Sequence, residues 1–200
     1  MRKRTKIGLA VLALIFSTSG WSADLAKGQD AYNSGDYQTA LAEWQPLAKE
    51  GYADAQFGLG LMFANGFGVT LNDDQALKWY HLAADQGHAQ AQCNLAVMFA
   101  NGWGVPQSSE EAFKWYSLAA EAGLTQAQFS LAKRYSKGLG IDKDSVAALQ
   151  WFSIAAELGN TNASFKRDEL AEKLSATEIA EADRLAGLWM ENNQALLASH

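Results

Sequence analysis

The chain has 200 residues, of which 16 are basic and 22 acidic, and its formal net charge is −6. A surface this acidic repels phosphate backbones, which excludes nucleic acid as an expected partner. The single cysteine, Cys93, cannot form an internal disulfide, so the fold must be held by a packed core.

Residues 1–22 have the pattern of a signal peptide. A basic segment, Arg2–Lys6, precedes the uncharged and mostly aliphatic run Ile7–Phe16, which is too short to span a bilayer comfortably. Small and polar residues follow, and the first acidic residue is Asp24. We therefore expect a cleaved leader and a periplasmic or secreted bacterial protein without a stable membrane anchor. An uncleaved N-terminal anchor is the alternative.

Residues 24–50 predict an atypical helix pair at the start of the folded part. Asp36 is a residue type that favours a helix N-cap. Trp44 lies where two later segments carry Tyr80 and Tyr116. The pair thus follows the pattern of the later segments with different residues, as expected for the end of an array.

A repeat of 36 residues organises residues 51–160 and continues without a gap from residue 36 to 165. The glycines and alanines that recur at this step are Gly51, Gly87, Gly123 and Gly159; Ala40, Ala76, Ala112 and Ala148; and Ala55, Ala91, Ala127 and Ala163. Tryptophans at Trp79, Trp115 and Trp151 each lie eight residues before one of the glycines. A fixed period of this length indicates stacked supersecondary units.

Each unit is expected to contain two antiparallel helices. Residue types that favour N-caps recur at the same step, namely Asp36, Asn72, Ser108 and Asp144. Asn72 with Gln75, and Ser108 with Glu111, have the spacing of a capping box. In the unit that starts at Asn72, we expect helices over about 73–86 and 89–101.

Residues 161–200 are expected to hold the last helix of the array and a C-terminal capping helix. Ser175 and Glu178 have capping-box spacing, and the helix that follows, about 176–192, carries Ile179, Ala182 and Trp189 on one face. This helix is predicted to cover the last open face of the core. Its charged outer face predicts a monomer, because it opposes end-to-end stacking.

The helical periodicity, with no period-two stretch of useful length, predicts an all-α fold without strands. A single helix pair cannot bury its apolar stripe, whereas stacked pairs share a continuous core. Positions that stay the same in every unit, such as Leu59, Leu95 and Leu131, should therefore lie inside. Positions that vary should face outward.

The patterns A-x-x-W-Y-x-x-A-A-x-x-G, A-x-A-Q-x-x-L-A/G and N/K-G-x-G-V/I together resemble the Sel-one-like repeat family, a relative of tetratricopeptide repeats. The third pattern occurs in full at Asn65–Val69, Asn101–Val105 and Lys137–Ile141. The resemblance covers about residues 40–165, with weaker tetratricopeptide-like similarity upstream. It implies a right-handed α/α superhelical solenoid of antiparallel helix pairs with a concave binding face, and adaptor roles in assembly, secretion or signalling. The paired cysteines of the disulfide-stapled secreted branch are missing here, so activities of that branch are not carried over.

The variable positions on the first helix of each unit predict a groove that is partly apolar and becomes basic toward the C-terminal end. In chain order they are Asp54, Gly58, Leu61 and Asn65; Gln90, Asn94, Val97 and Asn101; and Gln126, Ser130, Lys133 and Lys137. Apolar side chains at exposed positions, here Leu61 and Val97, favour a binding surface over an ordinary solvated face.

The middle residue of each loop gives a second candidate surface. Phe67, Trp103 and Leu139 are large and apolar at positions where loop tips are usually polar. Exposed aromatic residues are favoured as interface anchors. Packing of these residues against the neighbouring unit is the alternative.

Two patterns that resemble catalytic or nucleotide-binding motifs have simpler explanations. Ser130 and Lys133 match the S-x-x-K of serine β-lactam-active enzymes, but the chain contains neither S-D-N nor K-T-G. The G-x-G loops lack the preceding strand and third glycine of a dinucleotide site, so we expect them to be turns.

Three further residue sets are expected to be structural. The repeat tryptophans named above are expected in the core and not in a sugar-stacking row. The glutamines expected to bond between adjacent helices are Gln56, Gln92 and Gln128. The histidines expected at the surface are His81, His88 and His200. Their spacing offers no set of three or four converging ligands, so no zinc site is expected.

These observations predict an exported scaffold or adaptor that binds a segment of a protein partner in its concave groove. We expect no catalytic residue, metal or cofactor. Two alternatives stay open: a cell-wall or β-lactam-active protein that uses Ser130 and Lys133, and a structural component of an envelope assembly.

Overall fold

The computed structural model describes residues 23–198, and this part of the chain is helical without strands. The helices are α1 (Leu25–Ser34), α2 (Tyr37–Glu50), α3 (Ala53–Asn65), α4 (Asp73–Ala84), α5 (Ala89–Asn101), α6 (Ser109–Glu121), α7 (Thr125–Lys137), α8 (Ser145–Glu157), α9 (Thr161–Ala171), α10 (Ala176–Asn192) and α11 (Gln194–Leu197). The predicted signal peptide, residues 1–22, lies outside the described residues. None of the helices within 23–198 is long and apolar enough to cross a membrane.

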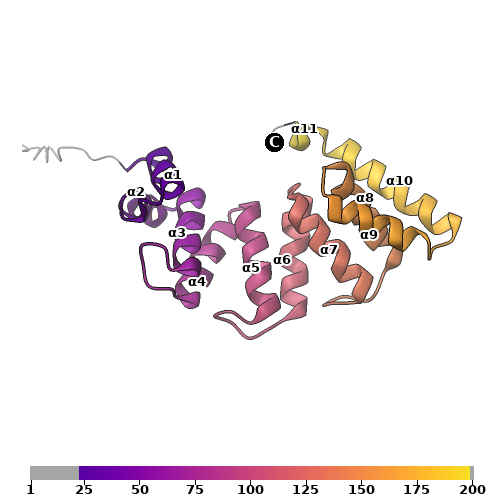
Figure 1. The fold of residues 1–200 in the computed structure, drawn as a ribbon, viewed down its shortest axis with the longest axis horizontal. Coiled ribbons are helices and arrows are strands. Elements are labelled where there is room, and N and C mark those ends of the chain that lie inside the picture. Colours follow the sequence, from indigo (N-terminus) through magenta and orange to yellow (C-terminus); the bar gives the residue numbers. More distant parts are fainter. Residues whose placement is uncertain (1–22, 199–200) are drawn as a thin grey trace, which may run out of the picture.

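The helices stack in chain order into a curved solenoid. Each helix from α1 to α8 packs against the next one along the chain, so the array grows in one direction. Figure 1 shows α1 and α2 at one end of the arc and α10 at the other, with the long loops after α3, α5 and α7 along the lower edge. The all-α solenoid predicted from the repeat is confirmed.

The predicted N-caps hold the starts of the even-numbered helices α2 to α8. The side chains of Asp36, Asn72, Ser108 and Asp144 each accept a hydrogen bond from a main-chain N–H of the first turn, at 2.9–3.2 Å. A complete capping box forms at Ser175 and Glu178, as predicted. At Asn72 and Ser108 only the cap itself forms, and the predicted return bonds from Gln75 and Glu111 are not made.

Residues that are constant across the units fill the interior. Leu59, Leu95 and Leu131 are buried, as are the alanines of the 36-residue step. Trp151 is buried, whereas Trp79 and Trp115 are half-buried and pack against the core clusters. The prediction that the tryptophans belong to the core is confirmed.

The constant glutamines join α3, α5 and α7 each to the even-numbered helix before it. The side-chain amides of Gln56, Gln92 and Gln128 donate to the main-chain carbonyls of Ala48, Ala84 and Ala120, at 3.1–3.2 Å. Because a buried carbonyl without a partner costs about 1–3 kcal/mol, these bonds stabilise each interface. The structural role predicted for the glutamines is confirmed.

The G-x-G loops are turns, as predicted, and they also set the distance between units. The first glycine of each loop ends a helix in the left-handed conformation, as Gly138 does at φ 69°. The second glycine packs on the start of the even-numbered helix of the unit before. At Gly140 an added Cβ would lie 2.1 Å from the carbonyl oxygen of Ser109, so a side chain cannot fit there.

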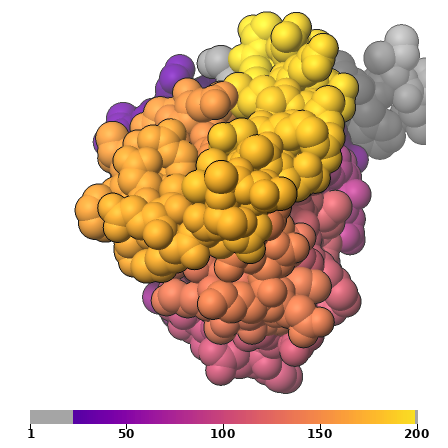
Figure 2. All heavy atoms as spheres, turned by 90° about the vertical axis from the view of Figure 1, so that its right-hand side faces the viewer, coloured from indigo at the N-terminus to yellow at the C-terminus, as the bar shows by residue number. Residues whose placement is uncertain are grey.

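At the C-terminal end, α10 packs mainly on α8 and not on α9. Trp189 of α10 lies edge-on to Trp151, and its Nε1–H donates to the Glu121 carboxylate at 2.8 Å. Figure 2 views this end, where α9 (orange) and α10 (yellow) both face the viewer. The predicted cap therefore covers α8 but leaves Phe165 of α9 67% exposed.

Candidate protein-binding surface

The variable positions predicted to form a groove lie on α3, α5 and α7, and all but Gly58 reach solvent. Asp54, Asn65, Gln90, Asn101, Gln126, Lys133 and Lys137 are exposed, and Leu61, Asn94, Val97 and Ser130 are half-buried. The distinction between constant interior positions and variable outer positions thus agrees with the structure, apart from this one residue.

Gly58 is buried, which corrects its placement in the groove. A Cβ at this position would lie 2.5 Å from Cε3 of Trp44, so the glycine makes room for the indole ring. One unit later, the smaller ring of Tyr80 leaves space for Asn94, and its phenol is hydrogen-bonded to the Asn94 side chain. The variable position therefore matches the aromatic residue beneath it.

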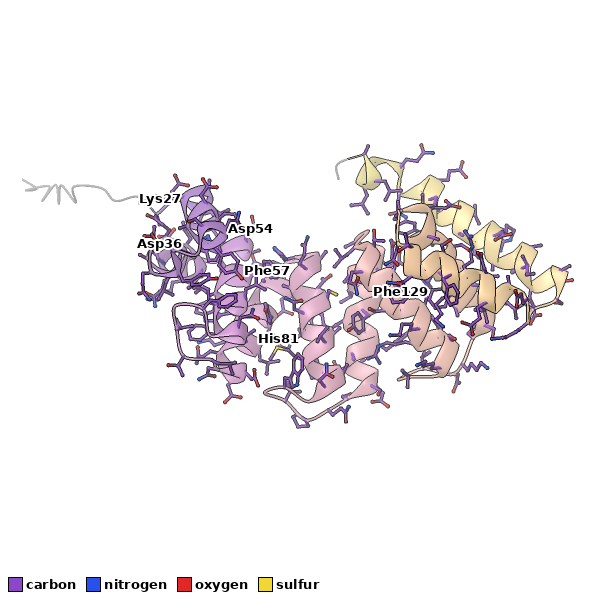
Figure 3. The ribbon with its side chains drawn as sticks, in the orientation of Figure 1. Lys27, Asp36, Asp54, Phe57, His81 and Phe129 are labelled. Carbon is purple, nitrogen blue, oxygen red and sulfur yellow. The ribbon has the colours of Figure 1, made fainter. Side chains whose placement is uncertain are left out.

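Ser130 contacts Tyr116 in the same way as Asn94 contacts Tyr80. The Ser130 side chain is hydrogen-bonded to the Tyr116 phenol, and burial raises the pKa of that phenol to about 12. Ser130 Oγ also donates to the carbonyl of Gln126 at 2.9 Å. Lys133 Nζ lies 5.5 Å from the ring centre of Phe129, a residue of α7 labelled in Figure 3. Ser130 is thus held by structural contacts, and the geometry offers no support for a nucleophile activated by Lys133.

Several polar residues of the groove are already engaged within the protein. The amides of Asn65 and Asn101 donate to the carbonyls of Leu61 and Val97 in their own helices, both at 2.8 Å. These bonds leave the side-chain oxygens available to a ligand. Asn65 and Asn101 therefore offer acceptors at the groove rim.

His88 is not the surface histidine that the sequence predicts. It caps α5 by accepting the Ala91 N–H at Nδ1, while Nε2 lies 3.3 Å from Asp54 Oδ1. Its ring stacks on Phe57, and both Asp54 and Phe57 are labelled on α3 in Figure 3. Burial lowers the pKa of His88, and the Asp54 carboxylate opposes this in part. Asp54 therefore serves the α3–α5 contact.

His81 fits the surface prediction better. Its side chain is partly exposed, and its ring meets Trp115 edge-on. His81 belongs to α4 and is labelled in Figure 3. His200 lies outside the described residues. Cys93 is buried, and burial raises the pKa of its thiol to about 11, so it stays protonated. No cluster of three or more metal-ligating side chains occurs within residues 23–198.

The three loop-tip residues differ because the residues they face differ. Phe67 stacks on Tyr37 with ring centres 4.7 Å apart, so the packing alternative holds for this tip. In the next two units, the position of Tyr37 is taken by Asp73 and Ser109. Trp103 and Leu139 therefore lack an aromatic partner there, and they are 51% and 41% exposed.

Both predicted surfaces meet in one hollow of about 300 Å³ between α3 and α5, which we term the first hollow. It is lined by Leu61, Ala64 and Asn65 of α3, Asp73 and Tyr80 of α4, Asn94, Val97 and Met98 of α5, and Trp103 of the loop. Ala64, Asp73, Tyr80 and Met98 were not predicted from the sequence. Ala64 and Met98 repeat between the first two units as Ala100 and Met62, and Asp73 and Tyr80 belong to the second helix of the unit. The apolar walls of the first hollow suit an apolar side chain of a ligand, and the amides of Asn65 and Asn94 at its rim suit hydrogen bonds to the main chain of that ligand.

A second hollow, of about 220 Å³, lies between α7 and α9. Its lining residues are Lys133, Ser136, Lys137, Phe152, Lys166, Glu169, Leu170 and Lys173. Lys166 and Lys173, which were not predicted from the sequence, extend the predicted basic end of the groove. The signal was present: one more step of 36 residues leads from Ser130 to Lys166 and from Lys137 to Lys173.

Comparison with known proteins matches this geometry to one family. The Sel1 repeat model matches residues 53–88, 89–124 and 125–160. A crystal structure of a Sel1 repeat protein from Oxalobacter formigenes is similar, with 38% identity and a TM-score of 0.61, over 65% of this chain and 98% of that one. A second similar structure is c5321, described as a protective antigen present in uropathogenic Escherichia coli strains displaying an SLR fold. It has 28% identity and a TM-score of 0.49, over 78% of this chain and 41% of that one.

None of the curated proteins gives a match to the chain. The Sel1 repeat model, in contrast, matches more than half of the residues in three consecutive units. The units begin at α3, α5 and α7, the helices that carry the variable positions described above. The chain therefore belongs to the Sel1 repeat family.

Proposed function

We propose that this protein is an exported scaffold that holds a segment of a partner protein along the groove of α3, α5 and α7. One observation carries the proposal: the variable helix positions and the loop-tip Trp103 meet in the same hollow. Exposed aromatic residues beside apolar pockets are preferred anchors in protein interfaces. Export is supported by the signal-peptide pattern of residues 1–22.

A binding role is also supported by the contacts of the other candidate residues. Ser130, the only proposed nucleophile, is hydrogen-bonded to Gln126 and Tyr116, and Lys133 points to Phe129. A scaffold needs no such pair, whereas it does need an accessible surface that differs from unit to unit. The groove has that property.

Site-specific photo-crosslinking tests the proposal. We expect benzoylphenylalanine at Val97 to give a discrete adduct in living cells, and Trp103→Ala to weaken it at least several-fold. The control position is Leu118 of α6, which is 51% exposed but outside both hollows. Equal labelling from positions 97 and 118, or no adduct at 97, would contradict a groove that binds a partner.

A further inference from the structure

The two hollows are the same structural feature, two repeats apart. Leu61, Ala64 and Asn65 of the first hollow are followed 72 residues later by Lys133, Ser136 and Lys137 of the second. In the same way, Tyr80 corresponds to Phe152, Asn94 to Lys166, and Met98 to Leu170. The array therefore builds one hollow twice and lines it with different chemistry.

The repeat does not require lysines at the positions that line the second hollow. At the equivalent positions the first hollow has Leu61, Asn65 and Asn94, and the helices pack in the same order there. Lys133 and Lys137 are exposed, and neither forms an ion pair with any described residue. Lys133 Nζ lies near the Phe129 ring, but no carboxylate of the described residues neutralises either lysine, so both positive charges can attract an acidic ligand.

Glu169 balances only part of this charge. Its carboxylate contacts Lys166 Nζ at 2.7 Å and Lys173 Nζ at 3.0 Å. Hydrogen bonds from these two lysines lower the pKa of Glu169 to about 2, so it stays ionised. Four lysines thus face one carboxylate, on a chain whose overall charge is −6. A local reversal of sign on an acidic protein selects an acidic ligand and opposes its binding elsewhere.

We infer that the partner segment is acidic at one end and apolar at the other. Its aliphatic or aromatic side chain occupies the first hollow beside Trp103, and its Asp or Glu side chains lie against Lys133 and Lys137 in the second. The inference rests on the proposed function, because both hollows belong to the proposed groove. It adds the chemistry of the segment and the order in which its apolar and acidic parts lie along the repeats.

Selection from a phage library of random twelve-residue peptides, with residues 23–198 as bait, tests both the proposed function and the chemistry inferred for the partner segment. We expect enriched peptides to combine an apolar residue with a cluster of Asp or Glu. Enriched peptides without acidic residues would overturn this inference and leave the proposed function standing. The absence of any enriched peptide would overturn both.

Lysine variants test whether the second hollow binds the acidic residues of the peptide. For a synthetic peptide of the enriched sequence, we expect Lys133→Gln with Lys137→Gln to weaken binding roughly tenfold at low salt, and added salt to shrink that difference. The control pair, Lys49→Gln with Lys143→Gln, makes the same change of net charge outside both hollows. If both pairs weaken binding equally, the peptide senses only overall charge and the assignment of the second hollow is wrong.

Discussion

At the scale of single residues, the variable positions of the repeat have two roles that the sequence does not separate. Asn94 and Ser130 reach solvent, but each also bonds to the tyrosine of the helix before it. Gly58 is buried against the ring of Trp44, which leaves no room for a side chain. A residue that varies between units can therefore differ because its buried neighbour differs, and not because a ligand selects it.

This coupling predicts the outcome of a double-mutant cycle at Trp44 and Gly58. We expect Gly58→Asn alone to destabilise the fold by about 1–3 kcal/mol, because its side chain collides with the indole ring. Adding Trp44→Tyr should recover part of that loss by recreating the pair of Tyr80 and Asn94. Urea denaturation measures the four free energies of unfolding.

A matched control for this cycle is Gly187→Ala in α10. No atom lies within 4 Å of a Cβ added there, so we expect a gain of about 0.5–1 kcal/mol from the better helix former. Strictly additive effects at Trp44 and Gly58 would show that the two residues are not coupled.

At the scale of helices, the sequence predicted positions well wherever the signal is local. The predicted ranges 89–101 and 176–192 match α5 and α10, because caps and apolar periodicity lie within the helix itself. The return bonds of Gln75 and Glu111 did not form, since a capping-box spacing permits that contact without requiring it. His88 was misjudged because its cap and its contact with Asp54 depend on how α3 meets α5.

The cap at His88 predicts a dependence of stability on pH. Burial lowers its pKa below the ordinary value of 6.5, so the unfolded chain binds more protons than the folded one between the two pKa values. We expect full stability above about pH 6.5, a fall as pH drops below 6.5, and a plateau below the folded pKa. Thermal unfolding between pH 5.5 and 7.5 measures this slope.

His88→Asn keeps a side-chain acceptor suited to an N-cap but removes the titrating ring, so the slope should flatten. His81→Asn serves as the control, because His81 caps no helix. A slope that survives in His88→Asn and disappears in His81→Asn would assign the effect to the wrong histidine and reject the prediction.

At the scale of the whole molecule, stability is expected to be the sum of contacts between neighbours. The sequence predicted the interior and the outward side of this array, because position within the repeat decides both. It did not predict the hollows, which need the placement of α3, α4 and α5 together. Nor did it predict that α10 packs on α8 and leaves Phe165 exposed, because the spacing of α10 is not fixed by the repeat.

Truncation of Trp189, which holds α10 against α8, tests whether stability depends only on contacts between neighbouring helices. We expect Trp189→Ala to cost about 3–5 kcal/mol, because it deletes the contact with Trp151 and the bond to Glu121. Hydrogen exchange measured by mass spectrometry should rise in α8 and α10 and stay unchanged in α1 to α3. Leu188→Ala, at a 43% exposed neighbour, should have little effect. Faster exchange throughout the chain in Trp189→Ala would show one cooperative unit instead.

The glycine contacts between units have a consequence for how such a groove can evolve. Gly68, Gly104 and Gly140 lie against the first residues of α2, α4 and α6, which belong to the unit before in each case, so successive helix pairs keep one separation. The proposed groove therefore has binding positions at a constant spacing. Duplication or loss of one 36-residue unit would lengthen or shorten the partner segment that it holds, while the residues that line each end of the groove stayed the same.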